Sequence, residues 1–505
     1  MLPAFVMNLS LPMCLSGIAT ALATLVGVFY LYAKYKLSYW SRRGVKSPPA
    51  HIIFGNMKDS ILFKNTPGQV LRDIYYSVDK DEPYVGCYLF HKPLLVLRSI
   101  ELVKQVMIKD FEVFPNRGFG GDTEADTLGY INLLGIRQPR WKYLRSKLTP
   151  CLTGQKLRNM LPLVVECSKN LMEYIESEKP DDQGSKCFEL KETAGKYCTD
   201  VFASVAFGVT TNCFDANNTE FWEAGKRVLH GLKRGIILII HFFLPELIRL
   251  TALVSRGPAK FFRDIFWHSY TTRERVGNKR GDLVDSLMAL KNGEQNPDFV
   301  FEDDNLVAQA VSFYVAGFEA TSTAIAFALY DLSRSPEHEE NVYKEITRIG
   351  HTNELTMDKL SEMTLLEKCI NESLRLHPPL PMNDRVCVRD YKIPGTDVVL
   401  EKGTTVYVAT CGTNSDPRFF KDPEKFDPTR TDSDNLGFSA AHLSFGIGPR
   451  SCIGQRFGLV IVKVALVMIL RKYTLTCKTT DHELKAGTVF TTAVHGVPLR
   501  MQRRH

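Results

Sequence analysis

One cysteine near the C-terminal end of the chain, Cys452, lies in a glycine-rich loop directly before an apolar stretch of helical length at 459–470. Glycines let a loop turn tightly and approach a flat ligand closely. A cysteine at a helix N-terminus meets free N–H groups and a positive dipole, which favour a reactive thiolate over a thiol. Taken alone, Cys452 would still be interpreted as a buried structural cysteine, the usual role of a free thiol.

The spacing around this cysteine is more specific than the cysteine itself. The loop FGIGPRSCIG follows the pattern F-x-x-G-x-R-x-C-x-G, met by Phe445, Gly448, Arg450, Cys452 and Gly454. It resembles the haem-binding loop of the cytochrome P450 family, the haem-thiolate monooxygenases. The resemblance implies that the cofactor is haem b (Fe-protoporphyrin IX), that these five residues bind it, and that Cys452 is the metal ligand. An axial thiolate pushes electron density toward the iron and favours O–O cleavage.

Two further motifs resemble the family's contacts with the haem propionates. Trp141 and Arg145 are four residues apart in a basic stretch at 137–147, so on a helix they share one face. Alone, this spacing is equally typical of an ordinary aromatic–cation packing pair. Arg385, in a short strand, resembles the family arginine that pairs with a propionate from the strand side.

The predicted long helix at 303–335 carries the sequence Ala-Gly-Phe-Glu-Ala-Thr at 316–321. A glycine within a helix costs up to about 1 kcal/mol relative to alanine, so Gly317 indicates either close helix packing or a groove for O₂. The stretch resembles the family's oxygen-activation motif, small-Gly-x-acid-Thr, which implies catalytic roles for Gly317, Glu319 and the nearby Thr321. The motif's threonine is replaced by Ala320.

This replacement predicts a modified proton relay. Successive helix positions differ by about 100°, so Thr321 cannot simply take the place of a hydroxyl at Ala320. Water, a local helix distortion or a substrate hydroxyl could substitute for it. We expect oxygen activation with some leakage to peroxide.

Glu372 and Arg375 stand three residues apart on the predicted helix at 365–376, which ends before Pro378. Such pairs are usually surface ion pairs worth under about 0.5 kcal/mol. Here the pair resembles the family's structural Glu-x-x-Arg, buried and completed by a downstream arginine. The sequence Phe-Asp-Pro-Thr-Arg at 426–430 offers Arg430 for that role.

The N-terminus has the clearest membrane signal. Residues 1–33 carry no charged side chain, and 22 helical residues at 11–32 would span about 33 Å, enough to cross a bilayer. Positive charges follow at once: Lys34, Lys36, Arg42, Arg43 and Lys46. The positive-inside rule then keeps the rest of the chain in the cytosol. We expect three parts: a signal-anchor transmembrane helix at 1–33, a basic, Pro-rich linker at 34–50 and a catalytic domain at 51–505.

A second apolar segment, at 235–244, predicts either core or a second contact with lipid. Over the whole chain the composition is that of a globular protein, with 44% hydrophobic residues and a net charge of +7, and it has no basic tract that would indicate nucleic-acid binding. The twelve cysteines form no C-x-x-C pair, which suits a reducing compartment. The expected fold is mainly α with small β-sheets (α+β), the cytochrome P450 fold preceded by one transmembrane helix.

The resemblance covers essentially the whole chain and is greatest to insect microsomal detoxification members, notably at 144–150 and 422–428. It implies a single-pass protein of the endoplasmic reticulum membrane that oxidises lipophilic xenobiotics such as plant toxins or insecticides. NADPH-cytochrome P450 reductase would supply electrons, with cytochrome b5 as an additional donor. Aromatic residues suggest either an apolar substrate pocket or plain core: Phe119, Phe313, Phe318 and Phe490.

Basic residues near the cysteine loop suggest either a docking surface for an acidic reductase or ordinary solvated charge; they are Lys421, Lys425, Arg456 and Lys463. Two other functions stay open. One is a haem-thiolate isomerase or dehydratase acting on a peroxide substrate, which Ala320 favours and Glu319 disfavours. The other is a catalytically silent carrier of haem or an apolar ligand.

Overall fold

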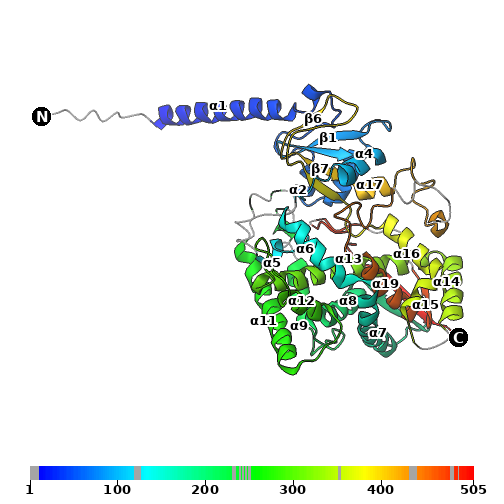
Figure 1. Cartoon of the computed structure of the whole chain (residues 1–505). Helices are drawn as coiled ribbons and strands as arrows, with labels where there is room; N and C mark the ends of the chain where they lie inside the picture. The colour runs from blue at the N-terminus through cyan, green and yellow to red at the C-terminus, as the bar shows by residue number, and fades with distance from the viewer. Residues whose placement is uncertain are drawn as a thin grey trace.

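The computed structural model describes residues 11–118, 127–229, 235–237, 240, 244, 247, 252–350, 354–431, 441–477, 483–486 and 488–504. A helical region forms most of the body, and a smaller sheet-rich region joins it to the N-terminal helix α1 (Leu11–Leu37), which projects away from both (Figure 1). The expected architecture, mainly helical with small sheets, is confirmed.

The described helices occur in the following order: α2 (Lys58–Ile61), α3 (Pro67–Tyr76), α4 (Ile100–Lys104), η2 (Gln105–Lys109), α5 (Thr127–Tyr130), α6 (Arg140–Leu148), η3 (Thr149–Leu152), α7 (Gly154–Ser177), α8 (Leu190–Phe207), α9 (Glu220–Leu229), α11 (Ala252–Val276), α12 (Leu283–Lys291), α13 (Asp303–Ser333), α14 (Pro336–Ile349), α15 (Met357–Glu362), α16 (Thr364–Leu376), α17 (Thr410–Asn414), η5 (Pro428–Thr431) and α19 (Gln455–Leu470). A short 3₁₀ helix, η1 (Ser41–Arg43), follows α1.

The larger sheet has the strand order β1-β2-β7-β4 and is built from segments far apart in sequence. Its members are β1 (Tyr84–Leu89), β2 (Lys92–Leu97), β7 (Thr405–Val408) and β4 (Asn383–Val386). β1 pairs antiparallel with β2, β2 parallel with β7, and β7 antiparallel with β4, where Arg385 faces Val406. This register places the Arg385 strand at one edge of the sheet.

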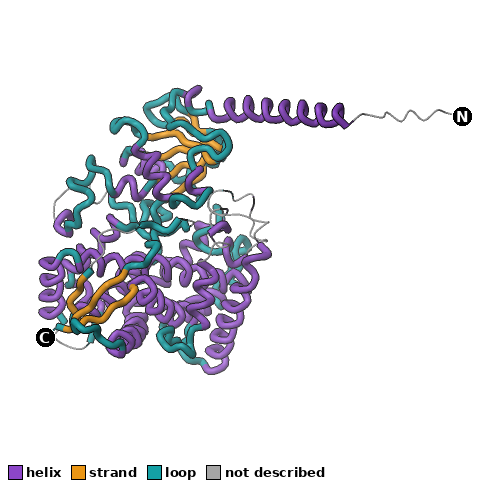
Figure 2. Tube along the Cα trace, turned by 180° about the vertical axis from the view of Figure 1, so that it is seen from behind, coloured by secondary structure: helices purple, strands orange, loops and turns teal. Residues whose placement is uncertain are grey.

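Two smaller sheets complete the β-structure of the described residues. One has the order β3-β9-β8, with β3 (Ser185–Glu189), β9 (Pro498–Arg503) and β8 (Tyr473–Thr476), and it lies against the helical region beside the C-terminus (Figure 2). The other pairs β5 (Tyr391–Lys392) with β6 (Val399–Leu400). The pairing of β3 with β9 ties the entry of α8 to the end of the chain.

The long helix α13 runs through the core and packs against α8, α16 and α19. It begins with Asp303 and Asp304, whose negative charge suits the positive end of the helix dipole. Its last turn precedes Pro336, which starts α14. The helix predicted at 303–335 is therefore present, and it can carry residues on opposite faces to different parts of the molecule.

The segment predicted as a linker at 34–50 belongs to the folded body. Helix α1 continues to Leu37, and the Trp40 side chain is fully buried against β1. Its indole N–H donates to the carbonyl of Cys87 over 3.0 Å, and Val45 is also buried. The body thus begins before residue 51, because burying the large apolar surface of the Trp40 indole favours packing on β1 over a solvated hinge.

Helix α1 is one of two described helices long and apolar enough to cross a membrane, and the apolar part of the stretch Leu15–Arg43 buries none of its residues. The other, α13, is mostly buried and serves as a core helix. Half of the apolar segment at 235–244 falls outside the described residues; within the described half, Ile236 is exposed and Ile237 is buried. Phe119 also lies outside them.

Gly86 in β1 lies directly under the indole of Trp40, and a Cβ there would overlap the ring. Gly86→Ala should therefore destabilise the body by about 1–3 kcal/mol through overpacking. The measurement is the shift in thermal unfolding midpoint followed by circular dichroism. Gly154→Ala, where no atom lies within 4 Å of an added Cβ, is the control. Equal midpoints for the two variants would contradict the packing of Trp40 on β1.

Candidate haem-binding site

The cysteine loop is a tight turn that depends on two glycines. Gly446 and Gly448 have φ values of +69° and +78°, a region that other residues rarely adopt. The N–H of Cys452 donates to the carbonyl of Phe445 over 2.8 Å. A Cβ at Gly448 would overlap the carbonyl oxygen of Met107, so this loop packs closely against η2. The backbone thereby positions Cys452 two residues before Gly454, which caps α19.

Cys452 retains accessible side-chain surface although protein atoms surround it closely enough to desolvate the thiol. Burial raises the pKa of Cys452, whereas the Gly454 N–H and the charges of Arg145 and Arg117 act in the opposite direction. The helix N-terminus alone therefore does not secure the thiolate, as the sequence had suggested it would. A bound metal cation would supply the missing positive charge, because a coordinating thiol is deprotonated outright.

Arginines gather beside this loop. The Arg450 guanidinium lies 4.3 Å from the centre of the Trp141 ring and donates to the carbonyls of Pro115 and Ile136 over 2.7 and 3.1 Å. Arg145, on α6 with Trp141, donates to the carbonyl of Ser451 over 3.0 Å. The structure thus brings Trp141, Arg145 and Arg450 together around the cysteine loop.

A fourth arginine, Arg117, was missed by the sequence reasoning. It donates to the carbonyl of Arg450 over 3.4 Å and lies 3.7 Å from the carboxylate of Asp384, the neighbour of Arg385 in β4. Its local signal, one arginine after Pro-Asn in a loop, is too common to distinguish it. Only the meeting of that loop with β4, where the N–H of Gly118 donates to the Asp384 carboxylate 266 residues along the chain, reveals the contact.

This arginine cluster (Arg117, Arg145, Arg385 and Arg450) has more positive charge than its surroundings compensate. Burial, and after it repulsion from Arg117, lower the pKa of Arg450 to about 8 and that of Arg385 to about 9, whereas Asp384 acts in the opposite direction. The Arg385 Nε atom is buried and makes no hydrogen bond within the described part of the chain. Because arginines stay charged in proteins, the cluster calls for an anionic partner. Two haem propionates beside a metal-bound Cys452 would meet both needs, so the residues present fit the group.

The middle of α13 exposes one face within the core. Ala316 is exposed and Ala320 partly so, and the two are one turn apart, although Phe318 and Glu319 between them are buried. Open space therefore lies along this face of the helix. At Gly317 the structure shows close packing, since a Cβ there would overlap the ring of Phe202 in α8. This was one of the two explanations of the glycine that the sequence left open, and its role in an oxygen groove stays a prediction.

The hydroxyls that follow Ala320 point elsewhere. Thr321 is buried, with its Oγ1 atom next to Gly458 of α19. Ser322 and Thr323 accept hydrogen bonds from the ammonium of Lys191 over 2.6 and 2.9 Å. The contacts of these three side chains are thus with α19 and with the start of α8, and a direct role of Thr321 in catalysis also stays a prediction.

Glu319 is buried and paired with Lys191, a residue that the sequence reasoning missed. The Lys191 ammonium lies 3.0 Å from the Glu319 carboxylate and donates to the Glu319 carbonyl over 3.1 Å. Thr492, in the segment before β9, donates to the same carboxylate over 3.4 Å. The acid of the predicted relay is therefore held by groups from α8 and from the C-terminal end of the chain.

Glu372, Arg375 and Arg430 form a buried charge cluster. The Arg375 Nε and Nη2 atoms donate to the two carboxylate oxygens of Glu372 over 2.9 and 2.8 Å, and both side chains are 0% exposed. The Arg430 Nε atom lies 3.1 Å from the same carboxylate. Arg375 also donates to the carbonyl of Asn414 over 2.7 Å. The cluster fastens α16 to the chain segment that leads to the cysteine loop.

One suggested docking residue is excluded by its burial. Lys463 is buried on α19, where its ammonium donates to the carbonyl of Leu360 over 2.6 Å and pairs with Glu367 over 2.7 Å. The suggestion that Lys463 docks a reductase is therefore wrong, because its ammonium group is already paired inside the protein. Lys421, Lys425 and Arg456 are exposed, which leaves them available for docking.

Removal of the central carboxylate should destabilise the site. Glu372→Ala leaves Arg375 buried without its bidentate partner, which costs about 3–5 kcal/mol, so we expect a protein that unfolds early and retains little haem. Thermal unfolding and haem content per polypeptide measure this. Asp358→Ala, which breaks an exposed ion pair with Arg158, is the control and should cost under about 1 kcal/mol. Normal haem content in Glu372→Ala would refute a structural role for the cluster.

Comparison with known proteins agrees with this geometry. The family model described as "Cytochrome P450" matches residues 45–498. The chain is 37% identical over 493 residues to "Cytochrome P450 6k1" of Blattella germanica, covering 92% of this chain and 93% of that protein. It is 34% identical over 505 residues to "Probable cytochrome P450 6g2" of Drosophila melanogaster, covering 95% and 97%. The chain therefore belongs to the cytochrome P450 family and is a haem-dependent monooxygenase of insect type.

Proposed function

We propose that this protein is a membrane-anchored monooxygenase that hydroxylates or epoxidises small lipophilic xenobiotics such as plant toxins or insecticides. It takes electrons from NADPH through NADPH-cytochrome P450 reductase, with cytochrome b5 as an additional donor. The observation that carries the proposal is the desolvated Cys452 thiol beside an arginine cluster that lacks anionic partners. The similarity of the chain to insect P450 proteins supports it.

The anchor supports the proposed location, the endoplasmic reticulum membrane with the catalytic domain in the cytosol. Helix α1 is apolar and buries none of its membrane-length window, and five basic residues follow within 34–46. Positive charge directly after an apolar helix keeps that side in the cytosol. A lipophilic substrate would partition into the same membrane, which brings it close to the catalytic domain.

The chain's own residues would divide the work as follows. Haem b bound through Cys452 supplies the oxidising chemistry. The arginine cluster holds and neutralises its carboxylates, and the tight turn at Gly446 and Gly448 positions the sulfur. The face of α13 with Ala316 and Ala320 leaves room for O₂, while Lys191 and Thr492 hold the Glu319 carboxylate as a proton carrier.

Turnover of a substrate panel tests this function. The full-length holoprotein should show the thiolate-specific absorption band when reduced and bound to CO. It should also oxidise members of a panel of plant toxins, insecticides and fatty acids only when NADPH, the reductase and O₂ are all present. Turnover of a peroxide substrate without reductase or O₂ would identify an isomerase or dehydratase instead. The CO band without turnover of any panel member would indicate a carrier.

The relay can be tested at Ala320. Ala320→Thr places a hydroxyl on the exposed face of α13. It should increase the share of NADPH electrons recovered in product and lower peroxide release several-fold. The reason is that general acid–base groups contribute about 10²–10⁴-fold to proton transfer. The readout is the ratio of peroxide formed to NADPH consumed. Ala320→Val, with similar volume and no hydroxyl, is the matched control. Unchanged coupling in Ala320→Thr would refute the modified relay.

A further inference from the structure

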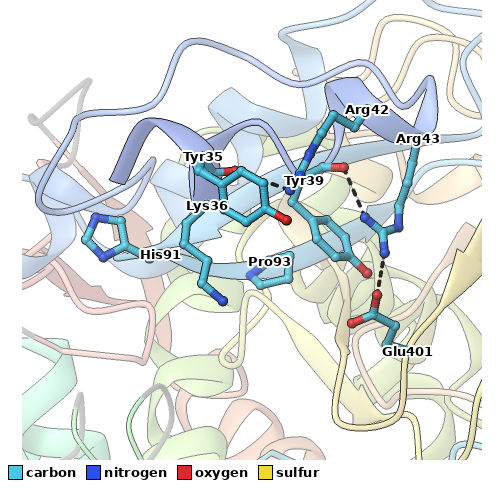
Figure 3. Close-up of a pocket in the computed structure, with 8 residues that line it drawn as sticks. All are labelled: Tyr35, Lys36, Tyr39, Arg42, Arg43, His91, Pro93 and Glu401. Atoms are coloured by element: carbon cyan, nitrogen blue, oxygen red, sulfur yellow. Dashed lines mark hydrogen bonds and ion pairs between the residues drawn. The ribbon is translucent and has the colours of Figure 1, made fainter. Parts of the chain in front are cut away.

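A cavity of about 420 Å³ lies where α1 meets the sheet-rich region (Figure 3). The end of α1 and η1 form one side of it, and the opposite side comes from His91 just before β2, Pro93 in β2 and Glu401 after β6. We name this cavity the collar pocket. It lies at the level where the proposed transmembrane helix would leave the bilayer, since the first charged residue of the chain is Lys34.

The collar pocket is preformed by contacts that fix α1 on the body. The ring of His91 makes edge contacts with the rings of Phe29 and Tyr32, each with centroids 5.7 Å apart. Ala33 is fully buried at this junction, and so is Trp40 immediately after the helix. The cavity therefore lies between two packed elements and is not a gap at a loose hinge.

Its charge is unevenly compensated. Arg43 pairs with Glu401 and stacks 3.6 Å from the centre of the Tyr39 ring, so its charge is already matched. Lys36 and Arg42 form no ion pair with any carboxylate in the described part of the chain. The collar pocket consequently carries a net positive charge of two, contributed by these two side chains.

Arg42 is held in place rather than free in solvent. Its guanidinium lies 4.0 Å from the centre of the Tyr35 ring and donates to the carbonyls of Ser38 and Tyr35 over 3.3 and 3.2 Å. Lys36 extends from the other side of the helix end toward His91 and Pro93 (Figure 3). An ordered arginine and a long lysine thus border one cavity lined by tyrosines, the residues that are enriched at membrane–water interfaces.

We infer that the collar pocket binds the headgroup of an anionic phospholipid from the cytosolic leaflet. A phosphate diester with a net negative headgroup matches the uncompensated Lys36 and Arg42, whereas a zwitterionic headgroup has no net charge to balance these cations. The position of the pocket at the exit of α1 offers it to lipid from the same bilayer. This inference rests on the proposed membrane anchoring, and bound lipid would brace α1 against β2.

The test compares lipid selectivity of the full-length holoenzyme in phosphatidylcholine bilayers. Spin-labelled phosphatidylserine and spin-labelled phosphatidylcholine are added separately, and electron paramagnetic resonance gives the fraction of each that the protein immobilises. Wild type should prefer phosphatidylserine. Lys36→Gln and Arg42→Gln should each lower that preference about fivefold, the effect of one basic residue near an anionic surface.

Lys34→Gln is the matched control. It removes the same charge from the same helix, but two positions correspond to about 200° of rotation, and Lys34 does not line the collar pocket. Diffuse attraction between a basic segment and an anionic surface would make Lys34→Gln and Lys36→Gln equally damaging, and that result would overturn the inference. So would a wild type without preference for phosphatidylserine.

Failure of the anchor is recognised separately. If alkaline carbonate released the wild-type protein from the bilayer, the proposed membrane anchoring would be wrong, and the lipid site would be excluded with it. If the protein stayed in the bilayer but all variants kept the wild-type preference, only the collar pocket would be refuted. The CO-bound absorption band of each variant should match wild type, because none of the three residues belongs to the cysteine loop or the arginine cluster.

Discussion

The arginine cluster lies in a partly buried region and has Asp384 as its neighbouring carboxylate; its members are Arg117, Arg145, Arg385 and Arg450. Repulsion among these guanidinium groups and their removal from water oppose folding, and the polypeptide described here provides only part of the compensation. Next to them a desolvated thiol is short of positive charge. One planar group with a cationic metal at its centre and two carboxylates at its edge would satisfy both deficits. The sheet, the cysteine loop and α6 each contribute one arginine to this cluster.

Helix α13 shows how one element serves several purposes by using its faces separately. Gly317 packs against Phe202 of α8, Glu319 is held by Lys191, and Thr321 lies next to Gly458 of α19. The remaining face, with Ala316 and Ala320, borders open space. Because successive residues differ by about 100°, a hydroxyl moved by one position leaves that face entirely. With alanine at position 320, the face that borders the open space has no hydroxyl at that position.

The N-terminal part of the chain is more closely joined to the body than its composition suggests. A basic, Pro-rich segment after an apolar helix is typical of a flexible connection, but Trp40 is buried under β1 and His91 contacts the aromatic end of α1. These contacts would give the body a defined orientation to the bilayer. They also create the collar pocket, where basic side chains that would otherwise be solvated meet in one cavity.

The sequence by itself determined the features that depend on neighbours along the chain. The positive-φ turn at Gly446 and Gly448, the Glu372–Arg375 pair three residues apart, and the end of α13 before Pro336 all follow from local geometry. Only the tertiary structure decided which distant groups meet. Lys191 and Glu319 are 128 residues apart, and the local sequence around either residue does not predict their contact. The burial of Lys463 could not be predicted from the sequence either. An isolated lysine in an apolar helix is compatible with a core or a surface position, and its ion pair with Glu367 depends on the tertiary structure. Side-chain period and turn chemistry act over a few residues, whereas the pairing and desolvation of charges depend on the whole packed chain.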